Sequence, residues 1–429
     1  MIKKKYLLVV LVLSLILSCK SEKEESVTQT KEEHTQEEQA DTVQTAVGEL
    51  ILPKPYASKS VRNERRMVDW PEDKMPMAPE GFTVTKLADD FKHPRWTYIG
   101  PNGDLFVVES DTKNSADRIT ILRDTNNDGT FELRETFLEG LNQPFGMLII
   151  GDTFYVANTD GLLKFPYKVG QTSIKSSEGE KIVELPAGGY NNHWTRNIIT
   201  NENQDKIYIS VGSASNVGEY GMEEEERRAN IIEVDLNGKE EIIYASGLRN
   251  PVGMDWNPVN GELWTAVNER DKIGDNLVPD YVTSVQKGGF YGWPYAYYGS
   301  IEDPRMEGKA PDLVAKTLVP DVSVGPHTAS LGLTFYTKDS FPDKYKNGVF
   351  VGQHGSWNRS VLSGYRVVFI PFENGKPTGK PQEFLTGFIA DENNSEVYGR
   401  PVCVTETPQG DLLVNDDDGS TIWKVSYTN

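Results

Sequence analysis

A short pattern that recurs six times constrains the fold of this chain more than any other feature. A tight polar turn precedes a run rich in β-branched and aromatic residues, and the six turns stand near residues 103, 151, 205, 261, 348 and 410. Such a turn beside such a run is typical of a β-hairpin. The copies are 48 to 87 residues apart, which leaves room for four strands in each unit. The sequence therefore predicts an all-β, six-bladed β-propeller with four-stranded antiparallel blades.

The rest of the chain supports an all-β fold. No long window has helical periodicity, and the best helical segment, residues 222–229, is too charged to be more than a surface excursion. Two β-sandwich domains are the alternative architecture. Two sandwiches do not account for six units in the same register, whereas a propeller leaves only short, protected sheet edges.

The N-terminal segment has the pattern of a targeting signal. Three lysines precede an apolar run over residues 6–17, which is too short to span a bilayer and ends in Ile-Leu-Ser-Cys at residues 16–19. This resembles a bacterial lipoprotein signal, with cleavage before Cys19 and lipidation of its thiol; an ordinary secretory segment with a chance cysteine is the alternative. The acidic stretch that follows lacks aromatic residues. We expect a signal peptide over 1–18, a lipidated cysteine with a disordered tether over 19–60, and the propeller over 61–429.

Charge and cysteine content exclude several classes of partner. The net charge of −20 argues against nucleic acid and anionic lipid as binding partners, so we expect membrane contact through the lipid anchor only. The two cysteines, Cys19 and Cys403, are too few for a disulfide scaffold or a thiolate zinc site. We expect Cys403 to be a small buried apolar residue.

The phase of the repeat predicts where polar groups gather. In a propeller, the residues just before the first strand of each hairpin and just after its second strand lie on the same rim of the central channel. His93, His193, Arg249, His327 and Arg400 stand before the hairpins, and His354 follows one of them. We therefore expect a polar, cation-rich mouth. Such a mouth suits a flat ligand with several carboxylates, and a neutral histidine there can act as a general base.

Five segments carry a resemblance to a known family. They are SGLRNPVG (246–253), KGGFYGWP (287–294), NNHWTRN (191–197), FVGQHGSWNR (350–359) and GRPVCV (399–404). Together they resemble the soluble glucose/sorbosone dehydrogenases, and the last three resemble the sorbosone-dehydrogenase-like branch. These are six-bladed propellers that use pyrroloquinoline quinone (PQQ) with a calcium ion. The resemblance covers roughly residues 80–427.

The resemblance implies a role for individual residues. His193 matches the base that takes the proton of the sugar C1 hydroxyl while hydride passes to the quinone. Arg249 and Asn250 match residues that contact PQQ, and Arg400 matches one of two arginines beside it. The main-chain carbonyls of Glu269 and Arg270 fall where the family holds the calcium ion. The position of His327 on the same rim makes it a further candidate for cofactor binding.

Two positions depart from the family pattern. The second arginine of the family is Val402 here, and the lysine that pairs with a PQQ carboxylate falls in the region 353–355, which has no lysine. His354 and Arg359 are the candidates to take the place of that lysine. The departures weaken the case for glucose as substrate more than the case for PQQ.

A second calcium candidate lies away from the predicted mouth. Asp124, Asn126, Asp128, Thr130 and Glu135 satisfy the spacing of a calcium-binding loop, D-x-[DN]-x-[DN]-G-x₅-E. The flanking residues have strand character rather than the helices of an EF-hand. The alternative is a plain polar turn between strands, and a bound calcium ion there would be structural.

The sequence favours one function over two alternatives. The favoured function is PQQ-dependent, calcium-assisted oxidation of an aldose or sugar aldehyde by a lipid-anchored protein of the cell envelope, with electrons passing to an unidentified cytochrome or quinone. The first alternative is a metal-dependent propeller lactonase, with Glu109, Asn158, Asn268 and Asp416 on a single ion. The second is a non-catalytic propeller that binds carbohydrate or protein.

Overall fold

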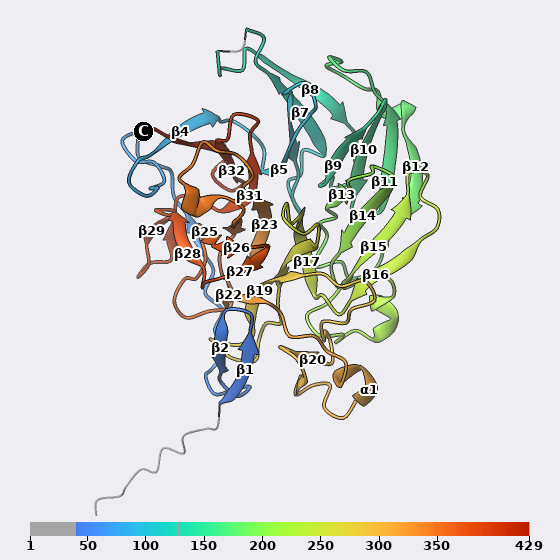
Figure 1. Ribbon diagram of the computed structural model, residues 1–429, viewed down its shortest axis with the longest axis vertical. Helices are drawn as coiled ribbons and strands as arrows, with labels where there is room; N and C mark the ends of the chain where they lie inside the picture. The colour runs from blue at the N-terminus through green and yellow to red at the C-terminus, as the bar shows by residue number, and fades with distance from the viewer. Residues whose placement is uncertain (1–39, 127, 429) are drawn as a thin grey trace, which may run out of the picture. The chain divides into compact units, whose positions relative to one another are not determined.

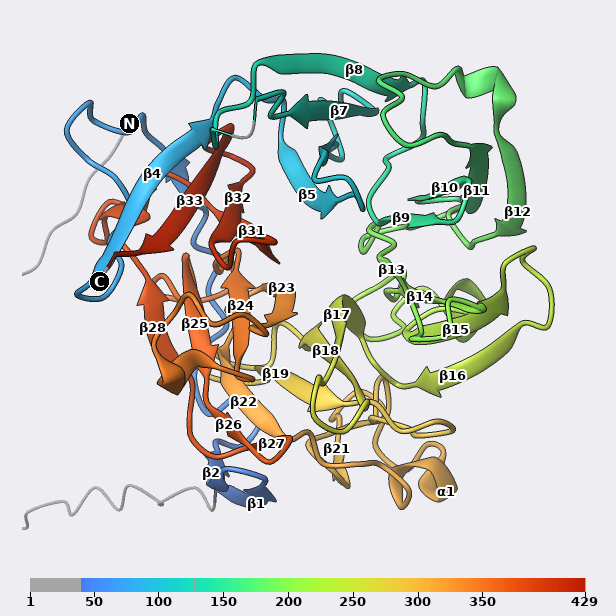
Figure 2. The ribbon, with the colours of Figure 1, turned by 45° about the horizontal axis from the view of Figure 1, so that its top comes forward.

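Six four-stranded antiparallel sheets follow one another around a ring (Figures 1 and 2). The structure is a computed structural model that describes residues 40–126 and 128–428. In this part of the chain it confirms the predicted six-bladed β-propeller. All six predicted turns join the first strand of a sheet to its second strand.

The first three sheets follow the chain without interruption, and their strands are given from the inside of the ring outward. The first sheet contains β5 (Pro94–Ile99), β6 (Leu105–Glu109), β7 (Arg118–Arg123) and β8 (Leu133–Glu139). The second contains β9 (Met147–Ile150), β10 (Thr153–Asn158), β11 (Gly161–Pro166) and β12 (Glu180–Glu184). The third contains β13 (Ile198–Thr200), β14 (Lys206–Val211), β15 (Asn230–Asp235) and β16 (Ile242–Ser246).

The last three sheets include insertions and the closure of the ring. The fourth contains β17 (Asn250–Trp256), β18 (Leu263–Asn268), β19 (Pro279–Ser284) and β22 (Val322–Pro326). The fifth contains β23 (Ser330–Phe335), β24 (Val349–Gln353), β25 (Arg366–Ile370) and β28 (Gln382–Leu385). The sixth contains β31 (Pro401–Glu406), β32 (Leu412–Asp416), β33 (Thr421–Tyr427) and β4 (Phe82–Ala88).

The sixth sheet combines the last three strands of the chain with a strand that precedes the first sheet. Strand β4 precedes the first sheet in sequence, yet it lies beside β33 (Figure 2). The two strands pair antiparallel, with Phe82 opposite Tyr427. Backbone hydrogen bonds thus close the ring between segments more than 300 residues apart in sequence.

The inner strands bring apolar side chains onto the axis of the ring. Strands β5, β17, β23 and β31 each carry a register irregularity near their start, at 94–96, 251–254, 330–333 and 401–404. Such bulges redirect side chains. The side chains gathered on the axis form an apolar plug of six residues: Trp96, Phe145, Trp194, Val252, Leu331 and Val402.

The N-terminal part of the described chain corrects the predicted tether. Residues 40–60 were expected to be disordered, but β1 (Asp41–Thr45) and β2 (Gly48–Leu52) form a hairpin. Val43 and Leu52 are buried in the same cluster as residues of the fourth sheet. Although the segment is acidic, these apolar residues supply enough buried surface to order it. The predicted signal peptide, Cys19 and the first part of the tether lie outside the described residues.

Several short elements lie outside the six four-stranded sheets. β3 (Arg66–Met67) pairs in parallel with β30 (Glu396–Val397), which also pairs with β29 (Ile389–Asp391). Two small hairpins are β20 (Ala296–Tyr297) with β21 (Ile301–Glu302) and β26 (Phe372–Glu373) with β27 (Lys376–Pro377). The helix α1 covers Pro311–Val314, and 3₁₀ turns cover Ser176–Glu178, Met222–Glu225 and Asp343–Tyr345. Within the described residues, no helix has the length and apolar character needed to cross a bilayer.

Candidate active site at the propeller mouth

A cavity of about 190 Å³ lies where the inner strands begin, above the apolar plug. Seven of the residues predicted from the sequence line it: His193, Arg249, Asn250, Glu269, His327, His354 and Arg400. They come from several different sheets and the loops between them. The repeat phase therefore gathers these residues at one rim, as expected from the strand direction. We call this space the inner cavity.

His193 is held as a neutral imidazole whose Nε2 is unprotonated. Its Nδ1 lies 2.8 Å from the main-chain oxygen of Ser213, which can only accept, so Nδ1 carries the proton. Its Nε2 lies 3.3 Å from the Nδ2 of Asn192, which can only donate. Burial and the charge of Arg249 lower the pKa of His193 to about 3. An unprotonated Nε2 with these neighbours has the form of a general base.

Arg249, Asp271 and His327 form one buried network. The Arg249 guanidinium donates to Asp271 at 2.9 Å, and the His327 ring lies 3.2 Å from the other oxygen of Asp271. Burial opposes the ionisation of Asp271, but the charge of Arg249 and the hydrogen bond from His327 outweigh it and lower its pKa to about 2. Burial likewise opposes the charge of His327, whereas the hydrogen bond and charge of Asp271 raise its pKa. The other ring nitrogen of His327, Nε2, lies 2.9 Å from the Gly274 carbonyl oxygen, so both ring nitrogens face oxygen acceptors.

Two adjacent aspartates hold the other cations of the mouth. Asp418 accepts from Arg65 at 2.5 Å and from Arg400 at 3.4 Å. Asp417 forms an ion pair with Arg95 and accepts from the Nε2 of His354 at 2.8 Å. Burial and the charge of Arg400 lower the pKa of His354 to about 3, so this histidine is neutral. The mouth is thus a network of paired charges, which refines the cation-rich mouth expected from the sequence.

Two further carboxyl groups have raised pKa values and are therefore less ionised than ordinary carboxyl groups. Burial raises the pKa of Glu269 to about 8 and that of Asp280 to about 6. Both residues line the inner cavity. At neutral pH, Glu269 is therefore mainly protonated, which leaves more of the positive charge of the arginines uncompensated.

Three sequence-predicted positions do not contribute a side chain to the inner cavity. The side chain of Arg270 forms an ion pair of 2.5 Å with the buried Asp303; the prediction for this residue concerned its main-chain carbonyl, which stays a prediction. Arg359 donates to the side-chain oxygen of Asn276 at 3.0 Å and is not among the residues that line the inner cavity. Val402 is fully buried in the plug, so the position that departs from the family pattern supplies an apolar floor.

The predicted site residues leave out Arg95, Asp271 and Asp417, although the phase of the repeat places all three at the rim. Arg95 lines the inner cavity and directly follows the His93-Pro94 pair at the start of a hairpin. Its phase was therefore a usable signal. Asp271 and Asp417 follow second strands at the phase of His354. Their pairing with particular cations depends on neighbouring sheets, which the repeat pattern does not specify.

The donor set fits a flat, carboxylated ligand with ring N–H groups. Two buried atoms of the lining, Arg95 Nε and Asn250 Oδ1, have no hydrogen-bond partner among the described residues. Such atoms are costly to bury unless a ligand or water meets them. Arg95 Nε requires an acceptor such as a carboxylate, and Asn250 Oδ1 requires an N–H group or a cation. A tricarboxylated quinone with a pyrrole N–H meets both requirements.

Comparison with known proteins places this arrangement in a family. The model of the TrAA12-like family matches residues 76–288 and 312–428, which include the inner cavity and all six sheets. The chain belongs to the TrAA12-like family.

Two curated proteins are similar in sequence to this TrAA12-like chain. An uncharacterised protein of Borreliella burgdorferi is 28% identical over 360 residues, covering 81% of this chain and 90% of the relative. The aldose sugar dehydrogenase YliI of Escherichia coli is 34% identical over 114 residues, covering 26% of this chain and 28% of the relative.

Solved structures share the architecture at low identity. The calcium structure of the Trichoderma reesei AA12 enzyme has a TM-score of 0.69 and 19% identity, covering 82% of this chain and 97% of the other. The holo form of the PQQ domain of pyranose dehydrogenase from Coprinopsis cinerea has a TM-score of 0.69 and 20% identity, covering 84% and 98%. The TrAA12-like chain therefore has the β-propeller fold of the PQQ sugar dehydrogenases.

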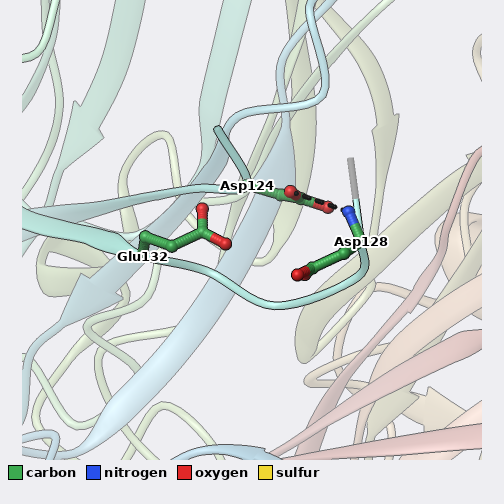
Figure 3. A group of neighbouring side chains, drawn as sticks. All are labelled: Asp124, Asp128 and Glu132. Carbon is green, nitrogen blue, oxygen red and sulfur yellow. Dashed lines mark hydrogen bonds between the residues drawn. The ribbon is translucent and has the colours of Figure 1, made fainter. Parts of the chain in front are cut away.

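The acidic loop of the TrAA12-like chain lies at the opposite end of the first sheet from the mouth. Asp124, Asp128 and Glu132 each offer an oxygen, and these oxygens lie within 4.8 Å of one another (Figure 3). Asn126 donates to Glu132 at 2.9 Å, and the Thr130 amide donates to Asp128 at 2.8 Å.

The geometry of this loop corrects one predicted ligand. Glu135 was expected to complete the set, but it lies within β8, opposite Ile121, and is exposed. The chain leaves the loop as an extended strand. Residue 135 therefore lies away from the other acidic side chains, whereas a helix would bring it back toward a bound ion. Glu132 takes its place in the group.

Of the four residues of the lactonase alternative, Glu109, Asn158, Asn268 and Asp416, only Asn268 lines the inner cavity. Glu109 is bound by Arg118 at 2.8 Å and by the Lys92 amide at 2.7 Å. Asp416 accepts the main-chain N–H of Arg400 at 2.7 Å. In the described part of the chain, the only cluster of three or more His, Cys, Asp or Glu side chains arranged for a metal is the acidic loop.

Proposed function

We propose that this chain is a PQQ-dependent, calcium-assisted dehydrogenase that oxidises an aldose or a related sugar aldehyde. The observation that carries the proposal is the inner cavity itself, where a neutral His193 stands among the guanidinium groups of the half-buried Arg95 and the buried Arg249 and Arg400. Support comes from the family match and from relatives whose names state a sugar dehydrogenase or a PQQ domain.

The residues of the mouth divide into those that bind and those that move a proton. Arg95, Arg249 and Arg400 would hold the carboxylates of PQQ, and the carbonyl groups near Glu269 would contribute to its calcium site. When bound, the cofactor would supply the hydride acceptor and its calcium ion would supply Lewis-acid polarisation of the quinone. His193 Nε2 takes the proton of the sugar hydroxyl, while the Ser213 carbonyl keeps Nδ1 protonated and the ring in place.

The plug contributes by keeping water out. Leu331 and Trp194 line the inner cavity and also belong to the plug. An apolar floor blocks the channel below the site and lowers the local dielectric, which strengthens the interactions of the charged groups with a ligand.

Steady-state reduction of an electron-accepting dye tests the proposal. The full chain, loaded with PQQ and Ca²⁺, should reduce the dye when an aldose is added. His193→Gln should lower kcat at least about 100-fold, because the proton acceptor is lost, while PQQ binding remains. His93→Gln is the matched control, since His93 does not line the inner cavity, and it should stay within a few-fold of wild type.

Two results would count against the proposal in different ways. Full turnover by His193→Gln would contradict the role assigned to that residue. Absence of PQQ binding would instead favour a non-catalytic propeller that binds carbohydrate or protein.

We also propose that a lipid on Cys19 anchors the protein at the cell envelope and that electrons pass to a cytochrome or quinone there. The motif at residues 16–19 supports the anchor. Two acyl signals or more are needed for stable anchoring, and a lipoprotein thiol and amine supply them. Cys19→Ala should release the protein from the membrane fraction, as measured by immunoblotting. Unchanged membrane association would contradict the anchor.

A further inference from the structure

A second, larger cavity of about 650 Å³ lies against the inner one. The two share four lining residues: Asn192, Arg249, Asp271 and Trp357. We call the second space the outer cavity. It is more than three times as large as the inner cavity, so its lining extends well beyond the reach of a single flat ligand seated among the arginines.

The far wall of the outer cavity is formed by the N-terminal strap, which we define as residues 56–66. Ser60, Val61, Arg62 and Glu64 of the strap line the cavity. The buried Asn358 donates to Ser60 Oγ at 2.9 Å and to the Val61 carbonyl at 2.8 Å. Arg65 joins the strap to Asp418, which also pairs with Arg400 of the inner cavity. The strap is therefore tied to the mouth on both sides.

The strap distinguishes this chain from the shared part of its family. The family match begins at residue 76, so every strap residue precedes it. The strap is nevertheless positioned by residues beside the fifth and sixth sheets, since the Asn63 amide donates to the Trp357 carbonyl at 2.8 Å and Arg65 pairs with Asp418. An element outside the family match that walls the mouth is well placed to set which substrates this chain accepts.

The chemistry of the outer cavity suits a neutral polyhydroxyl compound. Tyr190, which is 44% exposed, and the half-buried Trp357 both line it and offer aromatic faces. Its cations, Arg62, Lys272 and Arg249, are matched in number by the acids Glu64, Glu219 and Asp271. Balanced charge gives no advantage to a uronate or a phosphorylated sugar. Aromatic faces with scattered hydrogen-bonding groups suit a sugar ring, which has an apolar face and polar edges.

We propose that the outer cavity is a subsite for the second ring of a neutral oligosaccharide, with the N-terminal strap as its outer wall. The inference rests on the proposed function, in which the reducing-end ring reaches His193. The second ring then lies between Tyr190 and the strap. The preferred substrate is accordingly a disaccharide or longer sugar rather than a monosaccharide.

Substitutions in the outer cavity separate this subsite from the catalytic centre. In the full chain loaded with PQQ and Ca²⁺, kcat/KM should be higher for maltose or cellobiose than for glucose. Tyr190→Ala should lower the disaccharide value about tenfold and leave the glucose value within twofold. Tyr220→Ala is the matched control. The centres of the Tyr220 and Tyr190 rings lie 4.6 Å apart, but Tyr220 does not line the cavity. Val61→Trp, which fills the cavity from the strap, should act like Tyr190→Ala.

A binding measurement without PQQ keeps the test independent of turnover. Saturation-transfer NMR on the unloaded full chain should show maltotriose or cellotriose binding more tightly than glucose, with the preference lost in Tyr190→Ala. Equal binding of glucose and the trisaccharides, or equal loss of glucose and disaccharide turnover in Tyr190→Ala, overturns the subsite. A Tyr190-dependent preference in a protein that fails to bind PQQ supports the subsite and contradicts the dehydrogenase.

Discussion

His193 shows how one side chain can be fixed in a single protonation state. Its Nδ1 proton is committed to Ser213, and both burial and the charge of Arg249 disfavour protonation of Nε2. The pKa of about 3 lies well below neutral pH. The residue is therefore unprotonated over the whole range in which the protein is expected to work.

This protonation state predicts a flat acidic side of the pH–rate profile. Since a base with a pKa of about 3 stays unprotonated above about pH 4, kcat/KM of the loaded protein should not fall between pH 7 and pH 5 through protonation of His193. The measurement is the initial rate of dye reduction across this range. An acidic limb centred near pH 6.5 that is absent in His193→Gln would contradict the assigned environment.

His93 predicts a pH-dependent contribution to stability. Its hydrogen bond to Asp418, with the two atoms 3.5 Å apart, raises its pKa, and burial only partly opposes this. A raised folded-state pKa stabilises the protein below the unfolded-state value of about 6.5, and the contribution is lost as pH rises through the folded-state pKa. His93→Gln should lower the free energy of unfolding by about 1 kcal/mol at pH 5.5 and by much less at pH 8.5.

Denaturant unfolding at the two pH values checks this prediction. An equal loss at both values, or a larger loss at pH 8.5, would show that the charge of His93 does not stabilise the fold.

At the scale of single residues, the sequence identified the cations better than their partners. Arg249, Arg400 and the mouth histidines share a repeat phase, which fixes the rim on which they lie. Asp271 lies on that rim too, but its hydrogen bonds to Arg249 and His327 join segments that only the folded ring brings together. Arg359 was a candidate because the family resemblance lacks a lysine at 353–355, not because of the repeat phase, and it does not line the inner cavity.

At the scale of elements, the inner strands depend on glycine for their close approach. A Cβ atom at Gly332 of β23 would lie 2.3 Å from the Val402 carbonyl oxygen of β31. A Cβ atom at Gly253 of β17 would lie 2.4 Å from the Leu331 carbonyl oxygen of β23. Both are backbone contacts, so the strands themselves must move to relieve them.

Gly332→Ala should therefore destabilise the propeller by about 1 to 3 kcal/mol, as expected for overpacking. Gly188→Ala is the control, since a Cβ atom at Gly188 would have none of the described atoms outside its own chain neighbours within 4 Å, and it should change stability by less than about 0.5 kcal/mol. The free energy of unfolding in urea measures both. Equal losses of stability in the two variants would contradict the close approach of the inner strands.

The sequence predicted the six hairpins because each is local, with turn and strands adjacent in the chain. It did not predict β4 as the outer strand of the sixth sheet, since the pairing of Phe82 with Tyr427 has no local pattern. The hairpin of β1 and β2 was not predicted because the segment is acidic overall. Its composition does not indicate that Val43 and Leu52 pack on the fourth sheet.

At the scale of the whole molecule, we expect the stability of the propeller to depend on the closure of the ring by the pairing of β4 with β33. Val425 of β33 is fully buried and pairs with Val84 of β4. Val425→Asp places an unpaired charge at this closure and should lower the free energy of unfolding by about 3 to 5 kcal/mol. Thr85→Asp, on an exposed position of β4, should have little effect.

Calorimetry of the two variants tests the role of the closure. If Val425→Asp unfolds in one transition at a lower temperature, the ring behaves as one cooperative unit. A second transition that keeps the wild-type temperature would show that the other five sheets are stable without the closure.

The most direct test of the proposed cofactor site is a calorimetric titration of the full chain with PQQ in the presence of Ca²⁺. We predict saturable binding of one PQQ per chain, weakened at least about tenfold by Arg95→Lys, which keeps a charge beside Asp417 but lacks the unpartnered Nε. Absence of binding, or equal affinity in Arg95→Lys, would contradict the assignment of the propeller mouth as the site of a carboxylated quinone.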